Sequence, residues 1–171
     1  LERRNWNYRL RQEYNCLVTG VKTQTDRNLA IILSLLEQGK YIEMKIPLLS
    51  GVRDNVYKGV IFQTLLTICQ ETKLVRLGYH PLTGELEVTT EIALEDSELT
   101  DAQFDRYLNS LIAIANHLIL PRLEQVAKTG TDPIEQQWGE NFLSLLEKKA
   151  PIGFVEGLER ALLDRRQKKD R

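Results

Sequence analysis

The stretch that decides the fold is Leu74–Leu94, which reads LVRLGYH-PLTG-ELEVTTEIAL. In both halves the inward-facing, mostly apolar residues occupy every second position, as along a strand that buries one side. The inward set of the second half is Leu86, Val88, Thr90, Ile92 and Leu94. Pro81 and Gly84 supply the turn between the halves. The stretch therefore predicts a β-hairpin with one buried and one solvated face.

Three more strands are predicted upstream. The segment 14–22 (YNCLVTGVK) reads as a strand, and Leu29–Glu37 is followed by a short Gly39-Lys40 turn and then by Tyr41–Leu48. The composition of Leu29–Glu37 also suits a helix. A second hairpin is favoured because its partner alternates cleanly, with Ile42, Met44, Ile46 and Leu48 inward.

Two long helices follow the strand pairs. Asn55–Glu71 has helical spacing of apolar residues that include Val56 and Cys69, with Asp54 as its expected N-cap. The segment LTDAQFDRYLNSLIAIANHLILPRL begins with a capping box of Thr100 and Gln103. Pro121 lacks a backbone donor, so it is expected to kink or break this helix near Leu120.

The rest of the chain reads as a helical extension. Asp132-Pro133-Ile134-Glu135 is typical of a helix start, and Ile134, Trp138, Phe142 and Leu145 form its apolar stripe. A last helix is predicted over Phe154–Lys169, with Val155 and Leu158 on one side. We therefore expect an α+β domain over residues 1–130, an antiparallel sheet of about five strands packed on one face by two long helices. A two-helix extension over residues 131–171 is expected to pack on it.

Composition excludes several classes. The 171 residues have a net charge of -1, and the start LERRNWNYRLR lacks the apolar region of a secretory signal. Cys16 and Cys69 lie outside any metal-binding cluster, which favours a reducing compartment and the cytoplasm. Residues 1–11 hold four Arg against one Glu, and residues 164–171 hold five basic residues against two Asp. These basic ends could serve nucleic acid or a membrane surface, but solvated tails are favoured because no nucleic-acid motif accompanies them.

No catalytic motif, cofactor site or metal site is predicted. His80 and Glu85 flank the PLTG turn and are interpreted as a surface cross-strand pair. His117 is expected to be exposed or capping. Glu85, Glu87 and Glu91 share one strand face, which is interpreted as a solvated acidic face. The alternative is a small-molecule-binding protein or minor enzyme with a pocket between sheet and helices, which His80 or His117 would have to join.

The feature that favours binding is an apolar strand. Leu29–Glu37 is apolar on both sides, and the strand 14–22 lacks a polar face. A contiguous exposed apolar patch usually marks an interaction site. The predicted partner-binding residues are Ala30, Ile32, Leu36, Leu17 and Val21, for a protein partner, a partly unfolded segment or a second copy. The competing interpretation is that the segment around Trp6 and Tyr8, or the C-terminal helices, covers this patch.

The order of these elements resembles the YbjN-type, type III secretion chaperone-like family. The similar segments are LLEQGKYIEMKIPLL, PLTGELEVTTEIAL and LTDAQFDRYLNSLIAIANHLILPRL, within residues 14–127. The resemblance implies a small, often dimeric, non-catalytic fold that binds partly unfolded protein segments. The long form with extra helices resembles a cyanobacterial branch whose plastid relatives are linked to photosystem I assembly at the thylakoid. The helices after residue 131 depart from the short family pattern.

Overall fold

The computed structural model describes residues 1–95, 97–149, 151 and 153–169, and only the backbone of residues 155 and 169. It divides the chain into two compact units, Leu1–Asp132 and Pro133–Arg171. Each unit is described by itself.

The first unit is built on an antiparallel sheet. Within the described residues the sheet has six strands in the spatial order β1-β2-β3-β4-β6-β5. They are β1 (Tyr8–Arg11), β2 (Cys16–Lys22), β3 (Asn28–Leu36), β4 (Tyr41–Pro47), β5 (Arg76–His80) and β6 (Glu85–Ala93). The α+β class is confirmed, with one strand more than expected. The added strand is β1, whose four residues are too few for alternation to stand out from chance.

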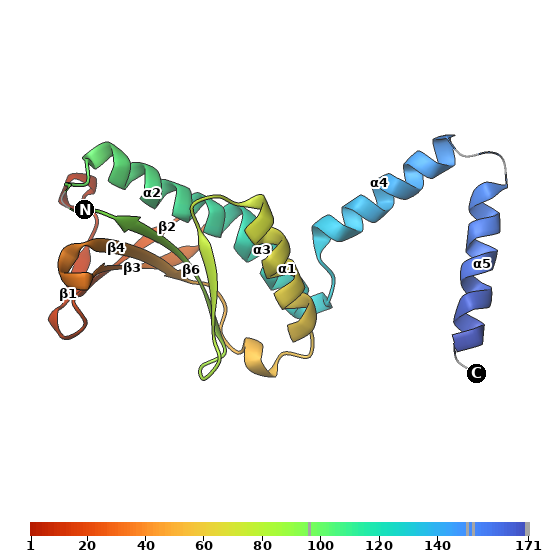
Figure 1. Cartoon of the computed structure of the whole chain (residues 1–171), viewed down its shortest axis with the longest axis horizontal. Helices are drawn as coiled ribbons and strands as arrows, with labels where there is room; N and C mark the ends of the chain where they lie inside the picture. The colour runs from red at the N-terminus through yellow and green to blue at the C-terminus, as the bar shows by residue number, and fades with distance from the viewer. Residues whose placement is uncertain (96, 150, 152, 170–171) are drawn as a thin grey trace. The chain divides into compact units, whose positions relative to one another are not determined.

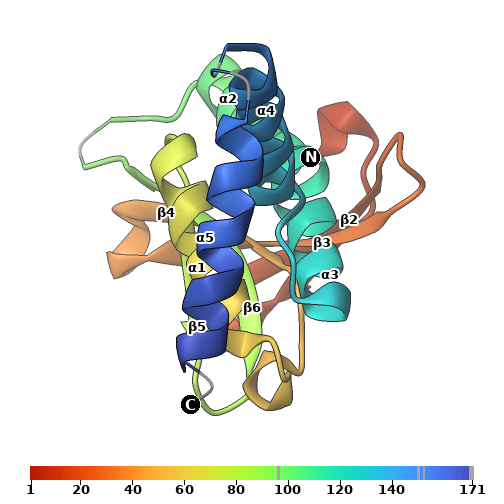
Figure 2. The same cartoon turned by 90° about the vertical axis from the view of Figure 1, so that its right-hand side faces the viewer.

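The helices of this unit form one layer on one face of the sheet (Figure 1 and Figure 2). They are α1 (Lys58–Glu71), α2 (Asp101–Ala113), the π-helical turn η5 (Ile114–Ile119) and α3 (Leu120–Thr129). Helix α2 packs over β4 and β6, and α1 packs over β5 and against α3. Short 3-10 turns join the other elements, namely η1 (Glu2–Arg4), η2 (Gln12–Tyr14), η3 (Glu37–Gly39) and η4 (Val52–Asp54).

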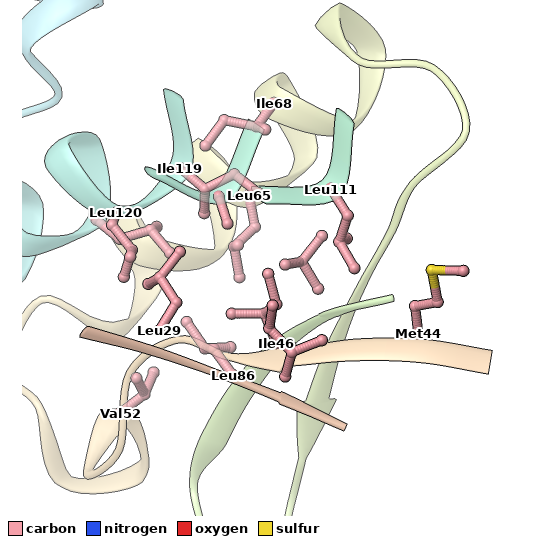
Figure 3. Close-up of a cluster of buried hydrophobic side chains, with 14 of the residues drawn as sticks. Leu29, Met44, Ile46, Val52, Leu65, Ile68, Leu86, Leu111, Ile119 and Leu120 are labelled. Carbon is pink, nitrogen blue, oxygen red and sulfur yellow. The ribbon is translucent and has the colours of Figure 1, made fainter. Parts of the chain in front are cut away.

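The core lies between this helix layer and the sheet. Figure 3 shows Leu29, Ile46 and Leu86 directed from the strands toward the side chains of the helices. Met44, Val88 and Leu111 are fully buried in the same cluster. The alternation predicted for Tyr41–Leu48 and Leu74–Leu94 is confirmed because each inward residue is buried or half-buried against this cluster.

Strand register separates the two faces of the sheet. Leu17, Leu33 and Met44 lie opposite one another on the face covered by helices. Val18, Ile32 and Lys45 do so on the other side, which we call the open face.

The sequence predicts two local features of the second long helix, a capping box at its start and a kink or break at Pro121. The capping box of Thr100 and Gln103 is present. Pro121 does not break the helix, because η5 widens the turn so that the Leu120 amide donates to the Ala115 carbonyl. Pro121 then occupies the first turn of α3, where its missing donor costs no hydrogen bond.

The start of α1 differs from the prediction. Its N-cap is Tyr57, without a side-chain cap, because η4 takes up Asp54 as a separate turn. The Asn55 side chain instead accepts from the Tyr57 amide at 2.8 Å. Val56, ahead of the helix, and Cys69 are exposed, so their predicted place on the apolar face is wrong.

Hydrogen bonds tie the β2–β3 turn to the helix layer. Thr25 Oγ1 donates to Asn116 Oδ1 of η5 at 2.7 Å. Arg27 Nη2 donates to Glu124 Oε2 of α3 at 2.9 Å, and this carboxylate raises the pKa of the Arg27 guanidinium. The turn end of β2 and β3 is therefore anchored, while their other ends run on toward η2 and η3.

The second unit consists of α4 (Pro133–Lys149) and α5 (Phe154–Lys169). Both helices begin where the sequence predicts them. Val155, predicted on an apolar side, and residues 170 and 171 of the basic end lie outside the described residues or side chains. Packing of this extension on the first unit stays a prediction. Among the described residues, no helix combines the length and apolarity needed to cross a bilayer.

Candidate functional site

The core extends to solvent at the β1 side of the sheet. Met44, Leu33, Leu17 and Leu10 form one row across β4, β3, β2 and β1 on the face covered by helices. Helices α1 and α2 pack over β4, β5 and β6, so the row leaves their cover as it approaches β1. The exposed fraction rises from 0% at Met44 to 58% at Leu10. The covered face therefore ends in an apolar surface that the first unit leaves exposed.

This surface is hollowed. A second row places Ile42 opposite Leu35, and Phe104 reaches the same place from α2. The hollow has a volume of about 250 Å³. We call it the edge groove, lined by Leu10, Leu17, Leu33, Leu35, Ile42 and Phe104 together with Asn15, Cys16 and Ser34. Pockets for drug-sized ligands measure roughly 300–1,000 Å³, so the edge groove suits one or two apolar side chains better.

A strained turn holds one wall of the edge groove in place. Asn15 adopts a left-handed backbone conformation with φ 46°. Its side-chain amide donates to the Leu35 carbonyl at 3.0 Å, and the Leu35 amide donates to the Asn15 carbonyl at 3.4 Å. Leu35 is thus fixed although its side chain is 48% exposed.

Strand β1 beside the groove is a free edge. Within the described residues it pairs with β2 alone, and all four of its residues are exposed. Arg9 and Arg11 lie opposite Val18 and Cys16 on the open face, whereas Leu10 lies on the groove side. An unpaired edge offers backbone donors and acceptors to an added strand.

The segment before β1 is attached to α2. Arg4 donates from Nε to Asp105 at 2.9 Å and from Nη1 to Asn109 at 3.0 Å, and Arg3 pairs with Asp101. The Tyr8 hydroxyl donates to the Glu2 carboxylate at 2.9 Å, which raises the pKa of Tyr8. These contacts position β1 against the sheet.

The five predicted partner-binding residues do not share one surface. Ala30, Ile32 and Leu36 lie on the open face, as their alternation suggested. Leu17 and Val21 lie on the covered face, opposite Leu33 and Leu29. The pairing register thus divides these residues between the two faces, which an all-apolar strand does not reveal in the sequence, and their role in partner binding stays a prediction. Leu17 lines the edge groove, and Val21 packs against the core.

The N-terminal segment, one of the two covers considered for the apolar patch, does not lie over the residues of the open face. Trp6 packs against the core cluster, and β1 extends the sheet instead of crossing its open face. Strands β4, β5 and β6 add ion pairs to the open face, with Lys45 Nζ 3.3 Å from Glu87 and Arg76 bound to Glu91 at 2.6 Å.

Neither histidine lines the edge groove. His80 lies opposite Glu85 as predicted, and its Nδ1 accepts from the Thr83 amide at 3.3 Å. His117 is exposed beside Asn116. Among the described residues, no three His, Cys, Asp or Glu side chains are placed to hold a metal.

The sequence analysis missed five apolar residues of the edge groove as binding residues: Leu10, Leu33, Leu35, Ile42 and Phe104. The sequence shows Leu29–Glu37 as apolar on both sides, so it did not reveal that Leu33 and Leu35 lie on the face covered by helices, at positions that remain accessible where this cover ends. The local signal for Leu10 is the alternation of Tyr8–Arg11, and four residues are too few for it to stand out from chance.

No protein-family model matches the chain, and no curated protein matches its sequence. Two solved structures are similar to part of it. A chain of the crystal structure of the ExsC–ExsE complex has 18% identity and a TM-score of 0.44, covering 60% of this chain and 73% of that chain. A chain of the HopA1–SchA chaperone–effector complex has 10% identity and a TM-score of 0.47, covering 69% and 84%. Both scores are below 0.5, so function is argued from this chain's own geometry.

Proposed function

We propose that this protein is a non-catalytic protein-binding module whose edge groove receives apolar side chains of an extended partner segment. The observation that supports this is the apolar row that runs from Met44 in the core through Leu33 and Leu17 to Leu10 at the unpaired edge. Exposed apolar surface of this kind usually marks an interaction site. The groove volume of about 250 Å³ fits side chains of a peptide.

The free edge suggests how the segment binds. An extended segment paired with β1 would direct alternate side chains to the two faces of the sheet. Side chains on the covered face would enter the groove beside Leu10. Those on the open face would meet Arg9 and Arg11, which favours carboxylates opposite them. The preferred partner segment therefore alternates apolar and acidic residues.

The test is selection of extended segments of about 12 residues from a displayed library, roughly three times the length of the four-residue strand β1. Binding of the selected segments is then measured by fluorescence anisotropy. Leu35→Asp should weaken it at least about tenfold, because a charge would enter the apolar groove. Ile32→Asp is the matched control on the open face of the same strand and should change affinity less than about twofold.

The open-face residues Ala30, Ile32 and Leu36 remain the second candidate surface, since they are apolar and Ala30 and Leu36 are exposed. If Ile32→Asp abolishes binding and Leu35→Asp does not, the segment binds there and the edge groove is the wrong site. If the library yields no segment that binds the wild-type chain, the proposed function is contradicted.

We further propose that the module acts in the cytoplasm or stroma, at the thylakoid surface, in assembly of photosystem I. The support is the resemblance of its hairpin and long helix to the cyanobacterial branch described above. Deleting the gene in a photosynthetic host that encodes this chain should lower the amount of assembled photosystem I, measured by its far-red absorbance change. An unchanged amount would contradict this role and leave segment binding intact.

A further inference from the structure

Helix α4 carries a regular stripe that the edge groove does not explain. Glu135, Trp138, Phe142, Leu145 and Lys149 follow one another at alternating spacings of three and four residues. This spacing places them in line along one side of a helix, as in the seam of a coiled coil. We call these five residues the α4 seam.

The middle of the α4 seam is apolar and exposed. The exposed fractions are 66% for Trp138, 59% for Phe142 and 51% for Leu145. An amphipathic helix derives most of its stability in a protein from burying such a stripe. We therefore expect the α4 seam to pack against another apolar surface.

The second unit is small for the apolar area it exposes. Helix α5 adds four large apolar side chains that are also exposed, namely Phe154, Leu158, Leu162 and Leu163. Chains below about 40 residues rarely enclose a core without a metal, disulfides or association with another chain. Because these two helices expose this much apolar surface, we expect them to associate with another helical unit.

The charges at the ends of the α4 seam decide in which direction a second copy of the helix can pair with it. Glu135 stands at its beginning and Lys149 at its end. Two parallel copies would place Glu135 against Glu135 and Lys149 against Lys149, which is repulsive. Two antiparallel copies would place Glu135 of one copy beside Lys149 of the second copy at both ends. The helix is thus complementary to itself in the antiparallel direction.

We propose that two copies of this chain associate through antiparallel pairing of their α4 seams, with Trp138, Phe142 and Leu145 in the interface. The spacing corresponds to the packing of left-handed helix pairs, in which axes cross at about 20°. The exposed side chains of α5 enlarge the buried area. This dimer does not depend on the edge groove, which lies in the first unit.

The test is the mass of the full chain in solution, measured by light scattering during gel filtration up to roughly 100 μM. The wild-type chain should have the mass of two copies. Trp138→Glu/Phe142→Glu should have the mass of one. Gln136→Glu/Gln137→Glu adds the same two charges to α4 outside the seam and should remain dimeric.

A milder variant tests orientation without changing the apolar residues. Lys149→Glu should weaken the dimer at least about fivefold, because it places two carboxylates together at each end. Glu135→Lys/Lys149→Glu should restore it. In a parallel dimer Lys149→Glu would only exchange one like-charged pair for another.

Three results would overturn the proposal. They are a monomeric wild-type chain at roughly 100 μM, a dimer that survives Trp138→Glu/Phe142→Glu, and a dimer indifferent to Lys149→Glu. Unchanged far-ultraviolet circular dichroism shows whether each variant retains its helices, including α4. Loss of segment binding by Leu35→Asp with the dimer intact separates the two proposals.

Discussion

The buried cation Arg122 on α3 offers a measurable stability prediction. Its Nε and Nη2 donate to the two carboxylate oxygens of Asp132 at 3.2 and 2.6 Å, and its Nη1 donates to Glu71 at 2.7 Å. The side chains of Arg122 and Asp132 are 4% and 0% exposed. Burial acts to lower the pKa of Arg122, but the two carboxylates outweigh it and raise the pKa. The contact joins α1, α3 and the last residue of the first unit.

Arg122→Met should be strongly destabilising. The methionine fills part of the space, but it leaves the Asp132 carboxylate buried without the guanidinium that neutralises it. Removing one partner of a buried ion pair costs about 3–5 kcal/mol. Against a typical unfolding free energy of about 5–15 kcal/mol, this is a large loss.

Arg76→Met is the matched control. Arg76 binds Glu91 at 2.6 Å, a distance like those of Arg122, but its side chain is 66% exposed. Water screens such a pair, so its loss should cost about 0–1 kcal/mol. The two variants make the same substitution and differ mainly in burial.

The assay is urea unfolding followed by fluorescence of Trp6, which packs against the core of the first unit. All chains carry Trp138→Phe, so that the signal comes from one unit. A cycle with Asp132→Asn should show a coupling of about 1–3 kcal/mol between the two positions. If Arg122→Met costs no more than Arg76→Met, or if the cycle is additive, the contact does not stabilise the unit as argued.

Two further variants probe local packing by the same assay. The Thr90 hydroxyl is buried without a hydrogen-bond partner among the described residues, so Thr90→Val should stabilise the unit by about 1 kcal/mol, and a loss of that size would contradict this. Gly130 ends α3 at φ 72°, and an added Cβ would lie 2.5 Å from the Tyr57 ring. Gly130→Ala should therefore lower the free energy of unfolding by about 2 kcal/mol or more. The control is Gly59→Ala in α1, where an added Cβ meets nothing and should raise that free energy by about 0.5 kcal/mol. Equal effects of the two substitutions would refute the reasoning.

Elements with a local determinant were predicted well. Strict alternation over Leu74–Leu94 specifies a hairpin because side chains alternate along any strand. The Thr100 capping box satisfies backbone groups within a few residues, and Pro133 suits the first position of a helix because that position has no amide bond to make. Such signals do not depend on the rest of the fold.

Elements whose outcome depends on neighbours were predicted poorly. Strand β1 exists because β2 offers an edge to its four residues. Pro121 leaves the helix intact because η5 widens the turn before it. The Asp54 cap fails because η4 takes that residue into a turn that packs near Gly84.

The sequence by itself determined the class of fold, the alternation of the strands, the start of both C-terminal helices and the apolar stripe of α4, since each follows from a local period or cap. Only the tertiary structure decided which apolar residues are accessible. Leu17 and Ile32 look equivalent in the sequence. The register between β2 and β3 puts them on opposite faces of the sheet, so Leu17 lies in the edge groove, where α2 no longer covers the sheet, and Ile32 lies on the open face. Accessibility depends on what covers a side chain, and the covering residues are far away along the chain.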